Sequence, residues 1–136
     1  METIRKAIAR CALEDVTFLE NGAVRRSYRF DQDFIGFSGH FPGYPILPAF
    51  IQVLTAMVVM EEAKGHELVL ELLEKAKFYI EVKPDTTVEV ICRERSRQGR
   101  ATIEAHLRVD GRDASALSLV CHSAHGQTTN ERKPVL

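Results

Sequence analysis

Two adjoining stretches decide the fold: Phe34–Pro48, FIGFSGHFPGYPILP, and Ala49–Met60, AFIQVLTAMVVM. The first contains three prolines and three glycines, which exclude a regular helix or a central strand and restrict the backbone closely. The second has only two polar interruptions, a proline directly before it, and Lys64 and Gly65 beyond it. We therefore predict a shaped loop that leads into a helix buried nearly all round.

This helix is a core helix and not a membrane span. At roughly 16 residues and 1.5 Å per residue it would be about 24 Å long, which is short for a bilayer. Its last turn also carries charged residues, among them Glu61 and Glu62, which we interpret as solvated ends of the helix. The sequence thus predicts a soluble protein.

The flanking segments predict one short helix and a set of antiparallel strands. Apolar residues at helical spacing favour an N-terminal helix over residues 3–12. A hairpin is expected from residues 16–19 and 23–30, joined through Asn21-Gly22. After the core helix we expect a four-stranded meander over residues 68–82, 86–95, 101–109 and 113–124, with turns at 83–85, 96–99 and 110–111.

One apolar helix and five or six strands in so short a chain indicate an α+β fold, because a sheet that curls round the helix covers every helix face. The chain has 136 residues, 45% of them apolar and 27% charged, with a net charge of -1. We predict a single domain over residues 1–125 and a polar, mobile tail over residues 126–136. The balanced charge does not indicate a nucleic-acid-binding protein.

The N-terminus has neither the continuous apolar core of a secretory signal nor the acid-poor composition of a transit peptide, so we expect a cytoplasmic protein. Cys11, Cys92 and Cys121 are widely spaced and form no CxxC pair. They predict reduced thiols, with no disulfide framework and no zinc site. No metal or cofactor is expected.

His40 is the candidate functional residue of the loop, because it lies just ahead of the buried helix. There it can reach the helix N-terminus, where free backbone N–H groups favour a carbonyl oxygen that acquires negative charge. A neutral imidazole beside such donors suits removal of the proton next to a thioester carbonyl. Position alone leaves open a purely structural histidine, which is the more frequent role of a loop histidine.

The run Gly39–Ala49, GHFPGYPILPA, resembles the active-site signature of the beta-hydroxyacyl-acyl-carrier-protein dehydratases, which reads approximately G-H-F-P-x-x-P-x-x-P-G. The order of elements agrees over residues 14–124. The resemblance implies a hot-dog fold, in which a curved antiparallel sheet wraps one central helix and two subunits pair edge to edge. It also implies an acyl thioester on acyl carrier protein or coenzyme A, held in a tunnel between the subunits of a homodimer or higher homo-oligomer.

The resemblance also assigns site residues. His40 matches the catalytic base, and Ala49 stands at the glycine whose backbone N–H contacts the thioester carbonyl. The further substrate-binding candidates are Phe41, Gly43, Phe50 and Leu54. Two more aromatic residues near the loop, Phe37 and Tyr44, either line the tunnel or belong to the core.

Leu54 departs from the family, which has Glu or Asp at that position, 14 residues after the histidine. The family's acid protonates the departing hydroxyl, a role worth about 10²- to 10⁴-fold in rate, and leucine has no proton to give. Gln52 and Thr55 are poor proton donors and are expected to bond to backbone or water. The leading hypothesis is a 3-hydroxyacyl-[acyl-carrier-protein] dehydratase-type enzyme of fatty-acid or related metabolism. The alternatives are a hot-dog thioesterase, or a non-catalytic acyl-binding or partner-dependent subunit, the last in a heterodimer.

Arg93, Arg95 and Arg97 recur at strand spacing and therefore share one face of a strand. This face either docks an acidic carrier protein or is a solvated sheet edge. His66, His106, His122 and His125 show no spacing that implies a metal or a dyad.

Overall fold

The structure, a computed structural model, describes residues 2–37, 43–97 and 100–124. Its elements, in chain order, are α1 (Ile4–Arg10), β1 (Thr17–Phe18), β2 (Val24–Phe30), the 3-10 helix η1 (Ile35–Phe37), α2 (Ala49–Lys64), β3 (Leu68–Phe78), β4 (Thr86–Arg97), β5 (Arg100–Val109) and β6 (Arg112–Ser123). Within the described ranges, no helix is both long and apolar enough to cross a bilayer. The predicted tail, residues 126–136, lies outside these ranges, as does the domain boundary at residue 125.

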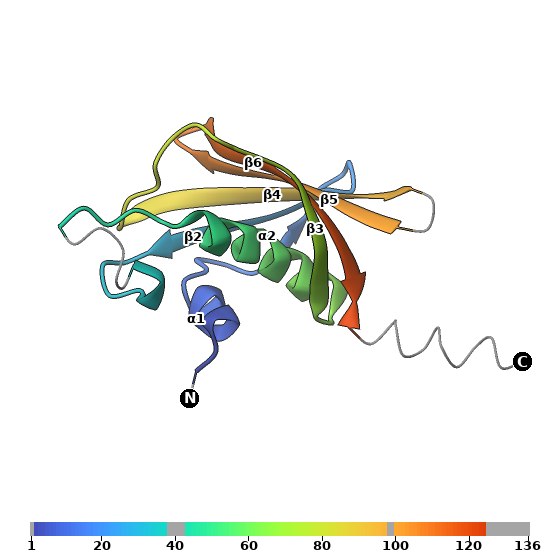
Figure 1. Cartoon of the computed structure of the whole chain (residues 1–136), viewed down its shortest axis with the longest axis horizontal. Coiled ribbons are helices and arrows are strands. Elements are labelled where there is room, and N and C mark those ends of the chain that lie inside the picture. Colours follow the sequence, from blue (N-terminus) through green and yellow to red (C-terminus); the bar gives the residue numbers. More distant parts are fainter. Residues whose placement is uncertain (1, 38–42, 98–99, 125–136) are drawn as a thin grey trace, which may run out of the picture.

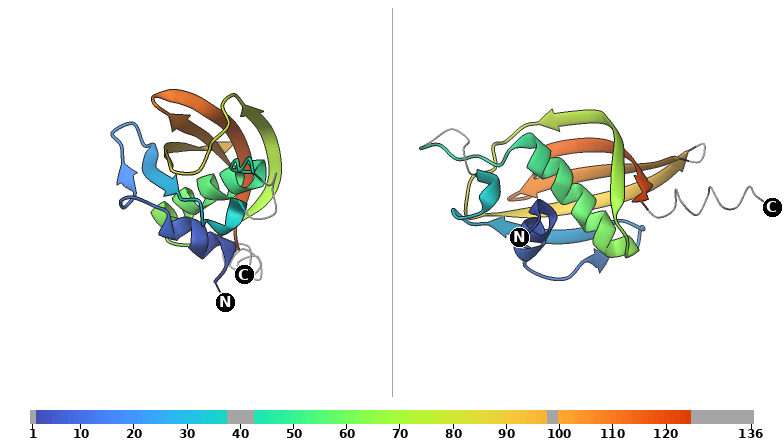
Figure 2. Two further views of the ribbon diagram at one scale, coloured as in Figure 1. Left: turned by 90° about the vertical axis from the view of Figure 1, so that its left-hand side faces the viewer. Right: turned by 60° about the horizontal axis from the view of Figure 1, so that its bottom comes forward.

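The six strands form one antiparallel sheet in the order β1-β2-β4-β5-β6-β3, and this sheet curves round α2 (Figure 1). α2 runs across the concave side of the sheet, and α1 packs against α2 from outside (Figure 2). Register shifts in the β3–β6 pair, between Leu70 and Leu72 and between Leu73 and Lys75, mark irregularities of the kind that bend a strand. The predicted α+β, hot-dog arrangement is confirmed.

The predicted four-stranded meander is wrong, because β3 pairs with β6 and not with β4. Only β4, β5 and β6 form a meander, and β2 takes the place beside β4. After α2 the chain enters β3 at the edge of the sheet opposite to β1 and β2. The connection from β3 to β4 then returns across the sheet to the place beside β2. Alternating hydrophobicity predicts that a strand exists but does not specify its neighbour.

Most element boundaries agree with the pattern-based predictions. Gly22, with φ of 85°, closes the β1–β2 hairpin, and Asp110 and Gly111, with φ of 52° and 76°, form the β5–β6 turn. Two boundaries differ. β4 continues to Arg97, past the predicted start of the turn over 96–99, and β3 ends at Phe78, four residues before the predicted end at residue 82.

α2 is buried along most of its length, as its composition predicts. Ile51, Ala56 and Val59 are fully buried, and α2 contacts α1, β2 and β4. Burial of each large apolar side chain contributes about 1.5–3 kcal/mol, so this helix anchors the core. The helix ends at Gly65, whose φ of 82° is left-handed and whose N–H donates to the carbonyl of Glu61.

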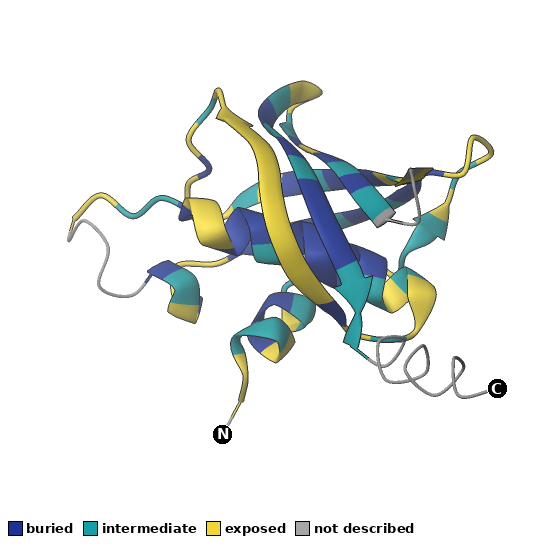
Figure 3. Cartoon of the chain, turned by 45° about the vertical axis from the view of Figure 1, so that its right-hand side comes forward, coloured by how far each residue is buried: buried dark blue, intermediate teal, exposed yellow. Residues whose placement is uncertain are grey.

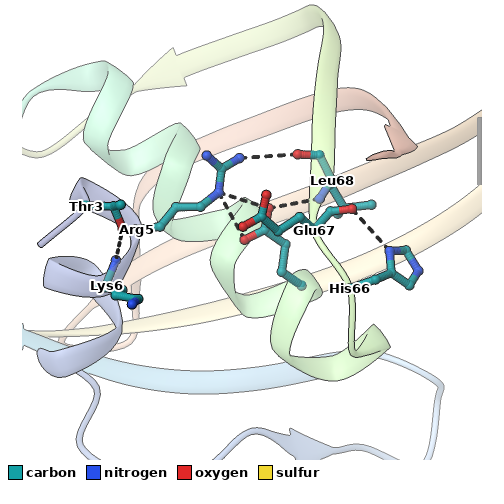
Figure 4. Close-up of polar contacts among 7 residues, drawn as sticks. Thr3, Arg5, Lys6, His66, Glu67 and Leu68 are labelled. Atoms are coloured by element: carbon teal, nitrogen blue, oxygen red, sulfur yellow. Dashed lines mark hydrogen bonds and ion pairs between the residues drawn. The ribbon is translucent and has the colours of Figure 1, made fainter. Parts of the chain in front are cut away.

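Glu61 is not a solvated helix end, which corrects the prediction for this residue. Its side chain is 11% exposed and accepts hydrogen bonds from Arg5 Nε at 3.1 Å and from the backbone N–H of Leu68 at 3.0 Å. Arg5 Nη2 also donates to the carbonyl oxygen of Leu68 (Figure 4). The carboxylate therefore joins α1, α2 and the first residue of β3, which fixes where the edge strand begins.

Candidate active site

The histidine loop lies partly outside the described residues. His40 and Phe41, two of the predicted site residues, belong to the undescribed stretch 38–42. The described part of the loop resumes at Gly43, whose φ of 84° is the left-handed region that favours glycine. An added Cβ at Gly43 would meet no atom within 4 Å, so backbone conformation, and not space, is what requires glycine at this position.

The segment that follows Gly43 is held by the β3–β4 connection. The backbone N–H of Leu47 donates to the carbonyl oxygen of Val82 at 2.7 Å, and the hydroxyl of Tyr44 donates to Glu81 Oε1 at 2.5 Å. Lys83 Nζ lies 5.6 Å from the centre of the Tyr44 ring. These three contacts fix the approach of the loop to α2.

The carboxylate of Glu81 raises the pKa of Tyr44, because it accepts the hydrogen bond of the neutral phenol and would repel a phenolate. Tyr44 is 49% exposed. Tyr44 therefore connects the outside of the loop to Glu81, and its place in a tunnel between subunits stays a prediction.

The N-terminus of α2 offers free backbone donors. Pro48 is the N-cap and makes no side-chain capping bond, and the first N–H bonded back toward the cap is that of Gln52, to the carbonyl of Pro48. The N–H groups of the first turn, which includes Ala49, thus precede the hydrogen-bond ladder of the helix. This is where an oxygen carrying partial negative charge is best stabilised.

A cavity of about 300 Å³ lies beside this helix start. Residues 46–49 and Gln52 line one side, and residues 78–81 line the other. Most of these side chains are apolar, so the cavity suits a short acyl chain that ends near the N–H groups of α2. The part contributed by residues 78–81 was missed in the sequence, because these residues follow a regular strand pattern and only the crossing of the chain brings them to the loop.

Two further predicted site residues, Phe50 and Leu54, lie on α2 but outside the described lining of the cavity. Phe50 is 60% exposed, and Leu54, one turn further on, is half-buried at the margin of the core. Residues four apart share a helix face, so Phe50 and Leu54 form one apolar side of α2. Neither belongs to the described lining of the 300 Å³ cavity.

The two polar residues of α2 make the local bonds that the sequence predicts. Thr55 Oγ1 donates to the carbonyl of Ile51 at 2.7 Å, and Gln52 Nε2 donates to the carbonyl of Leu47 at 3.1 Å. Both side chains are buried. The only carboxylate that lines the cavity among the described residues is Glu81, which is bonded to Tyr44.

Phe37 packs in the core, which agrees with the core alternative for this residue. It is 6% exposed and packs edge-on against Phe34 with ring centres 5.8 Å apart. Arg93 and Arg95 are exposed on the part of β4 that extends past its pairing with β2, which ends at Cys92, so β4 is bonded there to β5 on one side. Arg95 approaches Glu104 of β5 at 3.5 Å.

The remaining titratable groups do not suggest a metal centre. Within residues 2–37, 43–97 and 100–124, no three His, Cys, Asp or Glu side chains gather as metal ligands would. His106 lies 3.1 Å from Asp113, which also pairs with Arg108 at 3.4 Å, and His122 lies 2.7 Å from Glu71. The three cysteines are free thiols.

Comparison with known proteins identifies the family. A family model described as ApeI-like, ApeI dehydratase, matches residues 17–117. The chain belongs to the ApeI-like dehydratase family. A curated relative, the 3-hydroxyacyl-[acyl-carrier-protein] dehydratase FabZ of Bacillus velezensis, is 30% identical over 124 residues, which cover 82% of this chain and 81% of that protein.

Solved structures support the fold of this ApeI-like chain. A chain of the dehydratase heterocomplex ApeI:P from Xenorhabdus doucetiae superposes with a TM-score of 0.67 at 19% identity, covering 82% of this chain and 96% of that one. The E. coli PaaI protein gives a TM-score of 0.62 at 11% identity, with 88% and 86% covered. At these identities the likeness concerns the hot-dog fold. The family itself places the chain among dehydratase-like proteins that act on acyl chains.

Proposed function

We propose that this protein removes water from a beta-hydroxyacyl thioester, with His40 as the base and the backbone N–H of Ala49 as the donor to the thioester carbonyl. The observation that carries the proposal is the apolar cavity beside the uncapped N-terminus of α2, in a chain of a dehydratase family. The name of the FabZ relative states the same substrate chemistry, a 3-hydroxyacyl chain on acyl carrier protein. The reaction that we propose belongs to cytoplasmic fatty-acid or related acyl-chain synthesis.

The chemistry balances without a cofactor. His40 takes the proton from the carbon next to the carbonyl while the N–H of Ala49 stabilises the enolate-like oxygen. The C–H electrons form the new C=C bond as the C–O bond of the hydroxyl breaks, and the hydroxyl leaves as water after gaining one proton. Leu54 cannot supply this proton, so it comes back from His40 or from a group on another subunit.

The exposed edge of the sheet supports an assembly of at least two subunits. β3 ends the sheet, and every residue of this strand after Leu68 is exposed (Figure 3). Its apolar side chains Leu70, Leu73 and Phe78 pair across the ladder with Cys121, Leu119 and Ser115 of β6, which are buried, so they lie on the concave side. A second subunit paired along β3 would cover them and close the cavity, whose lining includes Phe78.

A partner-dependent subunit is the second candidate, and Leu54 favours it. One solved structure similar to this chain is the dehydratase heterocomplex ApeI:P. In the same arrangement, a different subunit paired with this chain would supply the acid that Leu54 lacks. Both candidates require the acyl thioester to bind, and they differ in whether the purified chain turns it over alone.

The test is turnover of a short 3-hydroxyacyl thioester by the purified protein, followed by the absorbance of the enoyl product. Replacement of His40 by alanine should lower the rate about 10²- to 10⁴-fold, because the base is lost. His66→Ala is the matched control, since His66 lies in the turn after α2, at the other end of the helix, and should leave the rate unchanged. Unaltered turnover in His40→Ala would refute the base assignment. A wild-type chain that binds the thioester without turnover would favour the partner-dependent subunit.

A further inference from the structure

The 300 Å³ cavity contains one buried polar side chain among apolar neighbours. Gln52 is 4% exposed, and it lies on the first turns of α2 between the apolar residues 46–49 and residues 78–80, which are aromatic or aliphatic. The other side chains of the lining that carry polar groups, Tyr79 and Glu81, are exposed, and Glu81 is already bonded to Tyr44. Gln52 therefore provides the hydrogen-bonding capacity of the inner cavity wall.

The amide of Gln52 is only half used. Nε2 donates to the carbonyl oxygen of Leu47 at 3.1 Å, and this contact fixes which end is the donor, because a carbonyl oxygen accepts only. Oε1 is buried and receives no hydrogen bond from the described part of the chain. The neighbouring polar residue, Thr55, differs in this respect, since its hydroxyl is bonded to Ile51.

An unpartnered buried acceptor is costly unless a donor reaches it. Oε1 is covered by surrounding atoms, so a donor meets it when the amide turns about its last side-chain torsion, which has a broad energy minimum. Gln52 and Ala49 are three residues apart and so lie on one face of the helix, both against the cavity. One ligand can thus contact the N–H groups at the helix start and the amide of Gln52.

We propose that Gln52 is a specificity-determining residue that accepts a hydrogen bond from the beta-hydroxyl of the bound acyl chain. This rests on the proposed function and adds the residue that distinguishes acyl thioesters with a hydroxyl near the carbonyl from saturated acyl thioesters. Gln52 does not replace the missing acid, because a neutral amide oxygen has no proton to transfer. It holds the hydroxyl in place while the carbonyl sits at the N–H of Ala49.

The experiment compares two unreactive ligands that differ only in the hydroxyl: the 3-hydroxyhexanoyl and the hexanoyl amides of pantetheine, in which nitrogen replaces the thioester sulfur. Calorimetry measures the dissociation constants for the full-length protein. Wild type should bind the hydroxylated ligand about 10- to 100-fold more tightly, because it satisfies a buried acceptor. Gln52→Met, which keeps the side-chain length, should abolish this preference and leave hexanoyl binding within about threefold.

Thr55→Val is the matched control, since it removes a buried hydroxyl from the same helix that is already bonded within the chain. It should keep the preference of wild type. Equal wild-type affinities for the two ligands would overturn the role of Gln52 and leave acyl binding intact, and this comparison needs no variant to fold. A preference that persists in Gln52→Met would also overturn it. Failure of both ligands to bind would instead refute the proposed function.

Discussion

Leu54 is the residue at which this chain departs most from the dehydratase chemistry that its loop implies. It is half-buried on the same side of α2 as the exposed Phe50. A carboxyl group placed there would lie against apolar neighbours, and burial raises the pKa of a carboxyl group. That is the property a general acid needs near neutral pH. Position 54 thus has the half-buried, apolar setting that suits a general acid, although the sequence has leucine there.

Leu54→Glu should therefore raise dehydration of a 3-hydroxyacyl thioester about 10²-fold or more, because in the proposed dimer the new carboxyl group of one subunit would donate a proton to the hydroxyl bound in the other. Initial rates of enoyl formation measure the effect. Leu54→Gln is the control of equal shape that lacks the proton, and it should give no gain. Equal gains in the two variants, or none in either, would mean that position 54 does not face the reacting hydroxyl.

The charged side chain of Glu61 has a structural role, because it holds elements of the fold together. Its carboxylate joins α1 through Arg5 and β3 through the N–H of Leu68. Its place in the last, charged turn of α2 suggested a solvent-exposed group. Glu61 is partly buried by its contacts with Arg5, 56 positions earlier in the chain, and with Leu68, 7 positions later. No local sequence pattern encodes these contacts.

At the scale of the element, β3 is an edge strand whose residues after Leu68 are all exposed. An exposed edge strand with unpaired backbone groups and apolar side chains is a template for pairing with another chain. Val69, Leu72 and Leu73 are each more than 40% exposed on this strand. The opposite edge, β1, has only two residues and offers far less backbone for pairing.

Leu73→Glu should weaken self-association at least about tenfold, because it places a charge on the apolar concave side of the β3 edge. Sedimentation over a range of protein concentrations measures the dissociation constant. Phe18→Glu is the matched control, since Phe18 is 66% exposed on the opposite edge strand. It should leave association unchanged. A wild-type chain that sediments as a monomer at all concentrations would exclude the β3 interface and the shared site.

At the scale of the whole molecule, burial in the interior favours the neutral forms of Tyr28 and Cys92. Burial raises the pKa of Tyr28 to about 12 and that of Cys92 to about 12, from ordinary values of 10.0 and 9.0. The unfolded chain releases these protons at lower pH than the folded chain. Folding is therefore favoured fully below pH 9, and this contribution is lost as pH rises through about 9 to 12.

The free energy of unfolding should accordingly fall across this alkaline window, with Tyr28 contributing up to about 3 kcal/mol. Urea titrations at pH values from about 8 to 11.5 measure the decline. In Tyr28→Phe, which keeps the ring, the decline above pH 10 should be smaller, while the part due to Cys92 remains. Identical pH profiles for wild type and Tyr28→Phe would show that Tyr28 does not ionise differently in the folded chain.

The sequence by itself determined the elements. The apolar run and its flanking Pro48 and Gly65 specified the central helix, and Asn21-Gly22 and Asp110-Gly111 specified two turns, because each depends on neighbouring residues alone. The loop signature also identified the dehydratase family. His40 as base stays a prediction, since it lies outside the described residues.

The tertiary structure alone decided that β3 is the edge strand and that residues 78–81 meet the start of α2 across a cavity. It alone decided that Gln52 lines this cavity and has a buried, unpartnered oxygen among the described residues, and that Glu61 is partly buried. The physical reason is common to all of these. Hydrophobic periodicity reports how a residue sits within its own element, whereas the path of the chain between elements decides which distant groups become neighbours.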